Sequence, residues 1–323
     1  MGAFISLCHL LGGITAFAVG LRLICDNLSH LFAGRARGLL ERSSRHPLGA
    51  VAVGGLMSAV TQSSTAVNVM LASMVAGGGL PLINACAMIV GTNMGTTVTA
   101  QLVSLGGVGG DFSPSAVSGI IGLLGLILPL AFGERFKKTG NSLVGFCLIF
   151  LGADVMSRAV SGFYGYSWFR AALSIKSPPI CLLNGFFLTA ICQSSSVVTA
   201  MLVILSGGGL VSIQSIIYYV IGANVGSCMA PLFLAGRLKG NGLTTAIFNL
   251  VFNILSAVVA IVPMVFFGEE LSLILLTLSK TAGGACAAFH TLFNVVIGLL
   301  LLPLLKPLLS LSLKIKGYLA KTP

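Results

Sequence analysis

Apolar stretches of about 20 residues recur along this chain, and they constrain its fold more than any other feature. Clear examples cover 4–23, 246–267 and 287–305. An α-helix of about that length spans the hydrocarbon core of a bilayer. The strands of a transmembrane barrel are about ten residues long and alternate between polar and apolar positions, and this pattern is absent here. The sequence therefore predicts an all-α polytopic membrane protein.

Charge and cysteine usage exclude other classes of protein. Only 8% of the residues are charged, against roughly a quarter in soluble domains, so the chain lacks the polar surface of a water-soluble fold. The net charge of +11 lies in short loops between apolar stretches, so we expect no nucleic-acid partner. The eight cysteines are scattered without the spacing of a metal site, and we interpret them as packing residues.

A duplicated polar motif organises the chain. Gln-Ser-Ser-Thr at 62–65 recurs as Gln-Ser-Ser-Ser at 193–196. Each copy is followed by a triple glycine and then by a Gly-x-Asn-x-Gly pattern, which contains Asn93 in the first copy and Asn224 in the second. The same offset of 131 residues separates the two leading glutamines and the two asparagines. Three matched features in one order indicate a duplication.

The duplication divides the chain into repeats at 1–135 and 136–267, followed at 268–323 by an outer loop, a last span and a basic cytoplasmic tail. In each repeat the polar motif interrupts an apolar run, at 47–79 and 178–209, that is too long for one span. We interpret each run as a re-entrant helical hairpin whose arms reach only partway across the membrane. The polar tip then lies near the midplane, where irregular backbone is tolerated only inside protein or against a cavity.

Three spanning helices and one hairpin in each repeat would invert the second repeat relative to the first. The predicted spans are 4–26, 81–104, 115–133, 141–157, 211–235 and 243–267, with a last span at 286–305. The first basic loop, placed inside, contains Arg35, Arg37, Arg42 and Arg45. Thirteen basic residues then fall inside and four outside, which is the bias of short cytoplasmic loops. We expect a multi-pass protein of the cell (inner) membrane with a cytoplasmic C-terminus.

The hairpin tips have the chemistry of an anion site. Each tip delivers serines to the start of a helical arm, where unpaired N–H groups and a partial positive charge attract anions. Because the spans contain almost no Arg or Lys, cotransported cations held by neutral oxygens would balance the anion's charge. The predicted substrate-binding residues are Ser63, Ser64, Ser194, Ser195, Asn93 and Asn224.

Other polar residues in the spans have competing interpretations. The Gly-x-Asn-x-Gly patterns fit either close helix packing or a broken helix that lines the site, and we favour the broken helix. Arg22 and Asp26 lie four residues apart, and we interpret them as a local interfacial pair rather than a substrate clamp. His290 is interpreted as a packed histidine rather than a proton relay.

These motifs resemble the type II sodium–phosphate cotransporter family, whose two halves carry Gln-Ser-Ser-Ser hairpins. The resemblance covers roughly Gly12 to Pro303 and includes the stretch His-Thr-Leu-Phe-Asn at 290–294. It implies a transporter rather than an enzyme, with sodium-driven uptake of inorganic phosphate by alternating access around the two tips. The implied sodium-binding residues are Gln62, Thr65, Thr96, Gln193, Ser196 and Ser227.

Several functions compete with that expectation. The first tip ends in Thr65 where the family has serine, a change that keeps the hydroxyl. We expect a short bacterial form without the C-terminal regulatory domain of many relatives. Symport of another small oxyanion, proton coupling and a passive anion channel remain alternatives. Inorganic phosphate, sodium ions and the lipid bilayer are the expected partners, sodium is the only cofactor expected, and a homodimer is left open.

Overall fold

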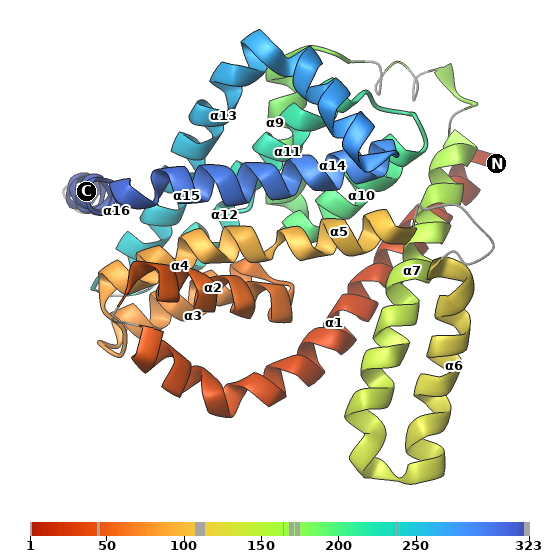
Figure 1. The fold of residues 1–323 in the computed structure, drawn as a ribbon, viewed down its shortest axis with the longest axis horizontal. Coiled ribbons are helices and arrows are strands. Elements are labelled where there is room, and N and C mark those ends of the chain that lie inside the picture. The colour runs from red at the N-terminus through yellow and green to blue at the C-terminus, as the bar shows by residue number, and fades with distance from the viewer. Residues whose placement is uncertain are drawn as a thin grey trace.

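The computed structural model describes residues 2–43, 46–106, 114–163, 165–167, 171, 175–236, 238 and 240–319; of helix residues 25–43, 106, 114–116 and 160–161 it describes only the backbone. This part of the chain is helical with no strand (Figure 1). Its segments long and apolar enough to cross a membrane are Gly2–Ile24, Glu134–Ala159, Ile213–Ala235, Gly242–Ser279 and Ala282–Leu319. The predicted all-α polytopic class is confirmed.

The helices fall into two halves and a C-terminal segment along the chain. Those of the first half are α1 (Gly2–Ser43), α2 (Pro47–Thr61), α3 (Ser64–Ala76), α4 (Leu82–Gly95), α5 (Thr97–Gly106), α6 (Pro114–Phe132) and the 3₁₀ turn η1 (Glu134–Phe136). Those of the second half are α7 (Lys137–Phe163), α9 (Pro178–Cys192), α10 (Ser195–Gly207), α11 (Ile213–Gly226), α12 (Met229–Ala235) and α13 (Gly242–Ser279). The chain ends in α14 (Ala282–Leu292), the π-helix η2 (Phe293–Ile297), α15 (Gly298–Leu301), η3 (Leu302–Leu304) and α16 (Leu305–Leu319).

Three segments predicted as loop or tail are helical instead, which corrects the sequence interpretation. The first basic loop is the C-terminal end of α1, which continues to Ser43 because residues 27–43 contain no proline and are rich in leucine and arginine. The predicted outer loop after residue 267 is the second part of α13. Phe267 has non-helical angles (φ −128°, ψ 20°) that bend α13 there. The basic tail forms α16.

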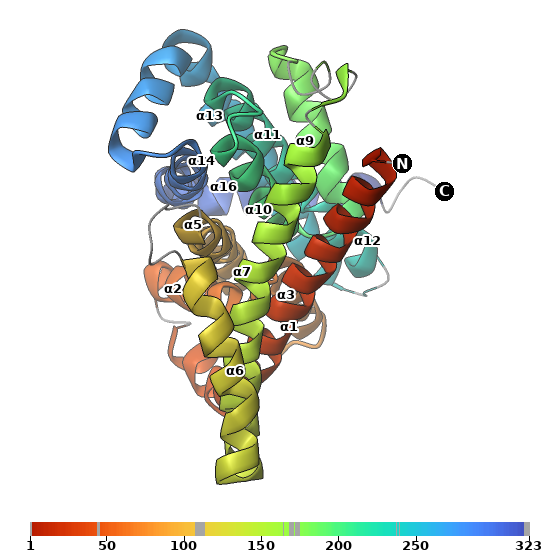
Figure 2. The same cartoon turned by 90° about the vertical axis from the view of Figure 1, so that its right-hand side faces the viewer.

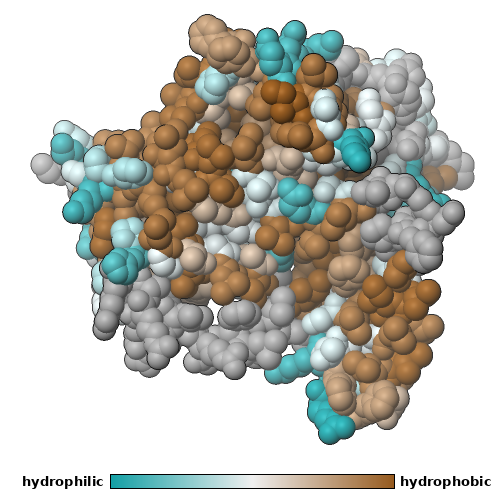
Figure 3. All heavy atoms as spheres, viewed as in Figure 1, coloured by the Kyte–Doolittle hydropathy of each residue, from teal (hydrophilic) through white to brown (hydrophobic). Residues whose placement is uncertain are grey.

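The charge bias across the membrane stays a prediction. Many of the side chains that carry it lie outside the described residues: those of Arg35, Arg37, Arg42, Arg45, Arg170, Arg237, Lys239 and Lys321. Figure 3 shows a broad apolar surface with hydrophilic residues gathered toward its extremities, as a bilayer-embedded protein requires. The inversion of the two repeats likewise remains a prediction.

Glycines let α1, α6 and α7 pack closely. Gly13 and Gly20 of α1 face Gly152 and Gly145 of α7, so that an added Cβ at Gly20 would lie 2.6 Å from the Gly145 carbonyl oxygen. The order of these pairs makes the two helices antiparallel. In Figures 1 and 2, α6 lies along α7 and extends away from the remaining helices.

Each polar motif lies between two helices that are too short to cross a bilayer alone. α2 has 15 residues and α3 has 13, about 22 and 20 Å at 1.5 Å per residue, against a core about 30 Å thick. α4 runs parallel to α2, since Gly54 meets Met88 and Ala59 meets Gly95. The chain between them therefore returns along α3. The pair α9–α10 (15 and 13 residues) repeats this arrangement beside α11. A pair of short helices thus stands at each predicted hairpin, and re-entry into the membrane stays a prediction.

The helices α13 and α14 occupy matching places beside the two hairpins. An added Cβ at Gly242, at the start of α13, would lie 2.9 Å from the Ala72 carbonyl oxygen of α3. One at Gly283, at the start of α14, would lie 3.0 Å from the Val203 carbonyl oxygen of α10. Ala72 and Val203 are 131 residues apart, like the tips, whereas the two glycines are only 41 apart. The helix that accompanies the first hairpin is thus α13, and α6 does not take that place.

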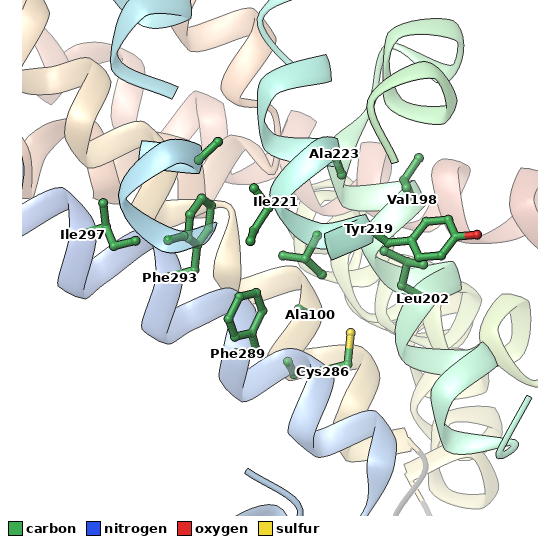
Figure 4. Packing of buried hydrophobic residues seen from close by; sticks show 14 of the residues in the cluster. Ala100, Val198, Leu202, Tyr219, Ile221, Ala223, Cys286, Phe289, Phe293 and Ile297 are labelled. Atoms are coloured by element: carbon green, nitrogen blue, oxygen red, sulfur yellow. The ribbon is translucent and has the colours of Figure 1, made fainter. Parts of the chain in front are cut away.

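An apolar core joins these elements. Figure 4 shows Phe289 and Phe293, from α14 and η2, on the same side as Ile221 of α11 and Ala100 of α5. All four side chains are buried in one cluster. Both repeats therefore pack on the α13–α14 pair around a common centre, and this packing positions the tips.

Candidate functional site

Each hairpin tip turns at a glutamine in the left-handed conformation. Gln62 follows α2 with φ 51° and ψ 23°, and Gln193 follows α9 with φ 53° and ψ 19°. A residue with a side chain adopts these angles at a cost of about 1–2 kcal/mol, and such residues cluster at functional sites. The matching angles show that the two copies of the motif build the same turn.

The serine after each glutamine caps the next helix. Ser63 Oγ accepts a hydrogen bond from the Ala66 N–H at 3.2 Å, and Ser194 Oγ accepts one from the Val197 N–H at 3.4 Å. A helix N-terminus leaves its first N–H groups without partners inside the helix. The first two N–H groups of α3 and of α10 therefore remain available at each tip, with the positive end of the helix dipole behind them.

Both tips line one cavity of about 530 Å³, a volume typical of small-molecule sites. The predicted site residues that line it are Gln62, Ser63, Ser64, Thr65, Gln193, Ser194, Ser195 and Ser196. The Ser64 and Ser195 side chains are each 7% exposed, and among the described residues neither hydroxyl has a hydrogen-bond partner. The cavity thus presents hydroxyl and N–H donors from both repeats.

Arg22 of α1 lines the same cavity. The sequence interpretation favoured a local pair with Asp26, whose side chain lies outside the described residues. The local pair therefore stays a prediction, and the structure adds that Arg22 shares a cavity with both serine tips. A guanidinium group offers five donors in a planar fork that matches oxyanions. Arg22 is therefore a cavity residue that sequence reasoning weighed as a substrate clamp and did not include among the site residues.

Three oxygen-bearing side chains meet where the tips touch. Thr99 of α5 donates a hydrogen bond from Oγ1 to Gln62 Oε1, and its Oγ1 lies 3.4 Å from Ser196 Oγ at the start of α10. Ser196 Oγ also lies 3.4 Å from the Gln62 backbone carbonyl oxygen. The two tips are therefore in direct contact, through atoms of both repeats.

The remaining predicted residues lie outside that cavity. Asn93 donates from Nδ2 to Asn253 Oδ1 at 3.3 Å, and Asn224 donates from Nδ2 to Asn294 Oδ1 at 2.9 Å. The offset between Asn253 and Asn294 is again 41 residues. Each motif asparagine thus joins its repeat to α13 or η2 through its Nδ2 group. Its own side-chain oxygen takes no part in this hydrogen bond.

The glycines around each asparagine serve packing. An added Cβ at Gly91 would overlap the Val51 carbonyl oxygen of α2, and one at Gly222 would overlap the Leu182 carbonyl oxygen of α9. The helix breaks directly afterwards, between α4 and α5 at Thr96 and between α11 and α12 after Gly226. The glycines therefore pack and the helix is broken, but the residues at the break do not line the tip cavity, contrary to the broken-helix interpretation.

Thr96 and Ser227 stand at these breaks. Their hydroxyls donate to the carbonyl oxygens of Asn93 at 2.7 Å and Asn224 at 2.6 Å. Neither residue lines the tip cavity. Their predicted role in sodium binding stays a prediction. Among the described residues, no group of three or more His, Cys, Asp or Glu side chains could hold a metal ion.

The sequence profile of the Na⁺/Pi-cotransporter family matches residues 16–158 and 167–302. The two matched stretches include both tips, both asparagine motifs and the partners Asn253 and Asn294. The chain belongs to the Na⁺/Pi-cotransporter family. It is accordingly a transporter and not an enzyme, as the sequence predicted.

Two relatives illustrate the range of the cotransporter family. The uncharacterized protein YqeW of Bacillus subtilis is 27% identical over 304 residues, which cover 90% of this chain and 92% of YqeW. YjbB of Escherichia coli K12, whose name describes it provisionally as an inorganic phosphate export protein, is 24% identical over 308 residues. These cover 94% of this chain but only 54% of YjbB, so the chain spans about half the length of that relative. No solved structure gives a significant match.

Sequence reasoning missed Thr99, Asn253 and Asn294. A signal for the last two was present, because Phe-Asn at 252–253 recurs as Phe-Asn at 293–294. The interpretation of the cysteines as packing residues holds for those that are buried, but Cys192 is exposed and lines the tip cavity. Thr99 had no such signal, since the second repeat has Ala230 at the corresponding position.

Proposed function

We propose that this cotransporter binds inorganic phosphate in the tip cavity and carries it across the membrane with sodium, in the direction of uptake. The observation that supports this most directly is the common cavity of the two tips. Paired helix N-termini, serine hydroxyls and the Arg22 guanidinium group all donate hydrogen bonds or carry positive charge there. Hydrogen bonds to a charged oxyanion are about twice as strong as those between neutral groups.

Sodium coupling is proposed from the neutral oxygens around the same tips. Gln62, Thr65, Gln193 and Ser196 supply amide and hydroxyl oxygens at the cavity wall. Oxygen ligands without formal charge suit a monovalent hard cation. A cation held there would offset the phosphate charge that Arg22 alone leaves unbalanced. Each ion would then strengthen the binding of the other, which is the requirement for coupling.

Alternating access is proposed from the duplicated hairpins. Two tips that enter from opposite faces would close the cavity alternately toward each side of the membrane. We place the protein in the cell membrane with α16 on the cytoplasmic side, because Lys306, Lys314 and Lys316 lie on this helix. With sodium more concentrated outside, coupled transport runs inward.

Export is the second candidate direction. It is favoured by the names of the YjbB relatives from Escherichia coli and Salmonella typhimurium. The residues that would bind phosphate are the same for both directions, since a carrier runs either way and the ion gradients set the net flux. Export from cells would require a coupling gradient directed outward, or phosphate at high internal concentration.

Transport by the purified protein in liposomes tests these proposals. An inward sodium gradient should drive ³²P-phosphate to an internal concentration above the external one, and reversing the gradient should reverse the flux. Accumulation driven equally by a proton gradient would replace sodium with protons. Uptake that only equilibrates would identify a passive channel, and stronger competition by sulfate than by phosphate would identify another oxyanion as substrate.

A matched pair of variants links transport to the tips. Ser64→Ala removes a hydroxyl that lines the cavity. Ser73→Ala removes one from the same helix, where the hydroxyl binds only the Val69 carbonyl oxygen. We expect Ser64→Ala to raise the phosphate concentration for half-maximal uptake and Ser73→Ala to leave it unchanged. Equal effects of the two substitutions would exclude the first tip from the phosphate site.

A further inference from the structure

The helix α13 is longer than one crossing of a bilayer requires. Its part from Gly242 to Phe266 has 25 residues, about 37 Å at 1.5 Å per residue, which already exceeds a hydrocarbon core about 30 Å thick. The helix bends at Phe267, at one end of the molecule (Figure 1), and Glu269 and Glu270 follow directly. The two carboxylates therefore lie where the hydrocarbon ends and the lipid headgroups begin.

A cavity of about 320 Å³ lies beside this bend, within the size range of small-molecule sites. Three segments line it: the chain at the start of α9, the first turns of α11 and the bend of α13. Its polar lining residues are Lys176, Gln214, Ser215, Tyr218, Glu269 and Glu270. None of its lining residues belongs to the tip cavity, so this is a separate site.

Most of these polar side chains have no partner within the described residues. Those that make neither a hydrogen bond nor an ion pair there are Lys176, Gln214, Tyr218, Glu269 and Glu270. The exception is Ser215, whose hydroxyl donates to the Ile175 carbonyl oxygen. An amine and two carboxylates thus line one cavity without pairing with each other. Both signs of charge are available to a ligand.

An apolar stripe on α13 leads away from the cavity. Ile254, Val258, Val262 and Val265 follow one another at intervals of three or four residues, which places them on one face of the helix. They are between 46% and 66% exposed. Val265 also lines the cavity, and the stripe extends from it for about 16 Å along the helix. A ligand that suits both features has a head with charges of both signs and a hydrocarbon chain.

We propose that this cavity binds a phospholipid whose headgroup carries a primary ammonium group, with an acyl chain along the α13 stripe. Glu269 and Glu270 accept hydrogen bonds from the ammonium group, which has three N–H donors. Lys176 binds the phosphate group, and Gln214 and Tyr218 supply further donors to it. The occupant follows from charge complementarity, because each charge of the headgroup meets an unpaired charge of the opposite sign.

The same contacts discriminate against other phospholipids. A trimethylammonium headgroup has the positive charge but no N–H donor for the carboxylates. An anionic headgroup without an amine leaves Glu269 and Glu270 unpaired and adds a like charge beside them, and such unpaired and like charges reject the wrong ligand. Phosphatidylethanolamine should therefore bind in preference to phosphatidylcholine and phosphatidylglycerol.

Matched charge variants test the site. The double variant Glu269→Gln, Glu270→Gln removes both carboxylates, and Lys176→Gln removes the amine. Glu134→Gln and Lys306→Gln are controls that remove the same charges away from the cavity. Native mass spectrometry of the purified protein with short-chain forms of the three lipids measures binding. Melting temperatures in detergent are the second measurement, since a ligand that binds the folded protein raises them.

We expect the parent protein to bind phosphatidylethanolamine roughly tenfold or more tightly than the other two lipids, as the loss of a hydrogen bond to a charged group implies. The double glutamate variant should bind all three lipids alike. Lys176→Gln should bind phosphatidylethanolamine more weakly but keep the preference for it. Glu134→Gln and Lys306→Gln should behave like the parent protein.

The results that would overturn the site are distinct. Equal binding of the three lipids by the parent protein, or an unchanged preference in the double glutamate variant, excludes the ammonium contact. Tighter binding of phosphatidylglycerol assigns the cavity to anionic lipid instead. Phosphoethanolamine without acyl chains that binds as tightly as the lipid contradicts the role of the stripe. Because binding is measured without phosphate or an ion gradient, failure here leaves the proposed transport function untouched. A monodisperse elution profile for each variant shows that the protein tested is folded.

Discussion

The hydroxyl of Ser196, in the second hairpin, lies 3.4 Å from the backbone carbonyl oxygen of Gln62, in the first. The two residues are 134 positions apart in the chain and belong to different repeats. One tip therefore cannot move along the other without breaking this contact. The contact gives the two tips a direct path through which a ligand at one tip could affect the other, as the proposed coupling requires.

Substitution of Arg22 tests whether positive charge in the cavity holds the substrate. Arg22→Gln keeps part of the side chain and removes the charge. A hydrogen bond to a charged group contributes about 1.5–3 kcal/mol, so the phosphate concentration for half-maximal uptake should rise roughly 10- to 100-fold. Arg22→Lys retains the charge but loses the planar fork, and it should give an intermediate value.

A control for Arg22 is available on α7. Arg158 binds Asp154 at 2.9 Å, is well exposed and does not line the tip cavity. Arg158→Gln removes the same charge from the protein and should leave the phosphate dependence unchanged. If the two glutamine variants behave alike, the effect of Arg22 is one of net charge and the clamp is wrong.

The paired short helices around each tip could be predicted because their chemistry is local. Gln62 and Gln193 end short apolar runs, and the serines that follow have the side chains a helix N-terminus needs. Because the motif occurs twice, the turn predicted for one tip could be compared with the turn predicted for the other. The same locality explains the confirmed helix breaks after Gly95 and Gly226, where the pattern and the break share a few residues.

Long-range partners could not be predicted in this way. Nothing beside Asn93 in the chain indicates Asn253, 160 residues away. Repeat symmetry was also misleading here. It suggests that α6, the last helix of the first repeat, packs beside the first hairpin. The structure uses α13 instead, and its offset of 41 residues from α14 differs from the 131 of the rest. The place of Arg22 in the cavity wall could not be predicted either, because sequence reveals neighbours along a helix and not the cavity across from it.

The close approach of α2 and α4 at Gly91 predicts that a larger residue there would disturb their packing. An added Cβ at Gly91 would overlap the backbone of α2, whereas one at Gly119 of α6 meets nothing within 4 Å. Gly91→Ala must push the two helices apart, at a cost of about 1–3 kcal/mol or more. Gly119→Ala should be neutral or stabilising by up to about 1 kcal/mol. Melting temperatures of the purified variants in detergent measure the difference, and equal melting would show that α2 and α4 are not in close contact.

The paired asparagines predict two energetic couplings of similar size. In double-mutant cycles with alanine, Asn93 with Asn253 and Asn224 with Asn294 should each couple by about 0.6–1.7 kcal/mol, the range found for hydrogen bonds between membrane helices. Thr277 lies far along α13 and donates only to the Leu273 carbonyl oxygen. The cycle of Asn93 with Thr277 should therefore be additive. Coupling in only one asparagine pair would contradict the matching roles of α13 and η2.

The exposed thiol of Cys192 allows a chemical test of the cavity in the parent protein. Its thiol is exposed beside Gln193, whereas Cys86, Cys228 and Cys286 are buried at 0% exposure. A negatively charged methanethiosulfonate reagent should enter the cavity, attach an anion at Cys192 and inhibit uptake, because the added sulfonate occupies the space of the substrate and takes up its donors. Phosphate present during the reaction should slow the modification. Cys192→Ala should transport phosphate and resist the reagent. If Cys192→Ala is inhibited as strongly as the parent protein, or if phosphate gives no protection, the substrate does not bind between these tips.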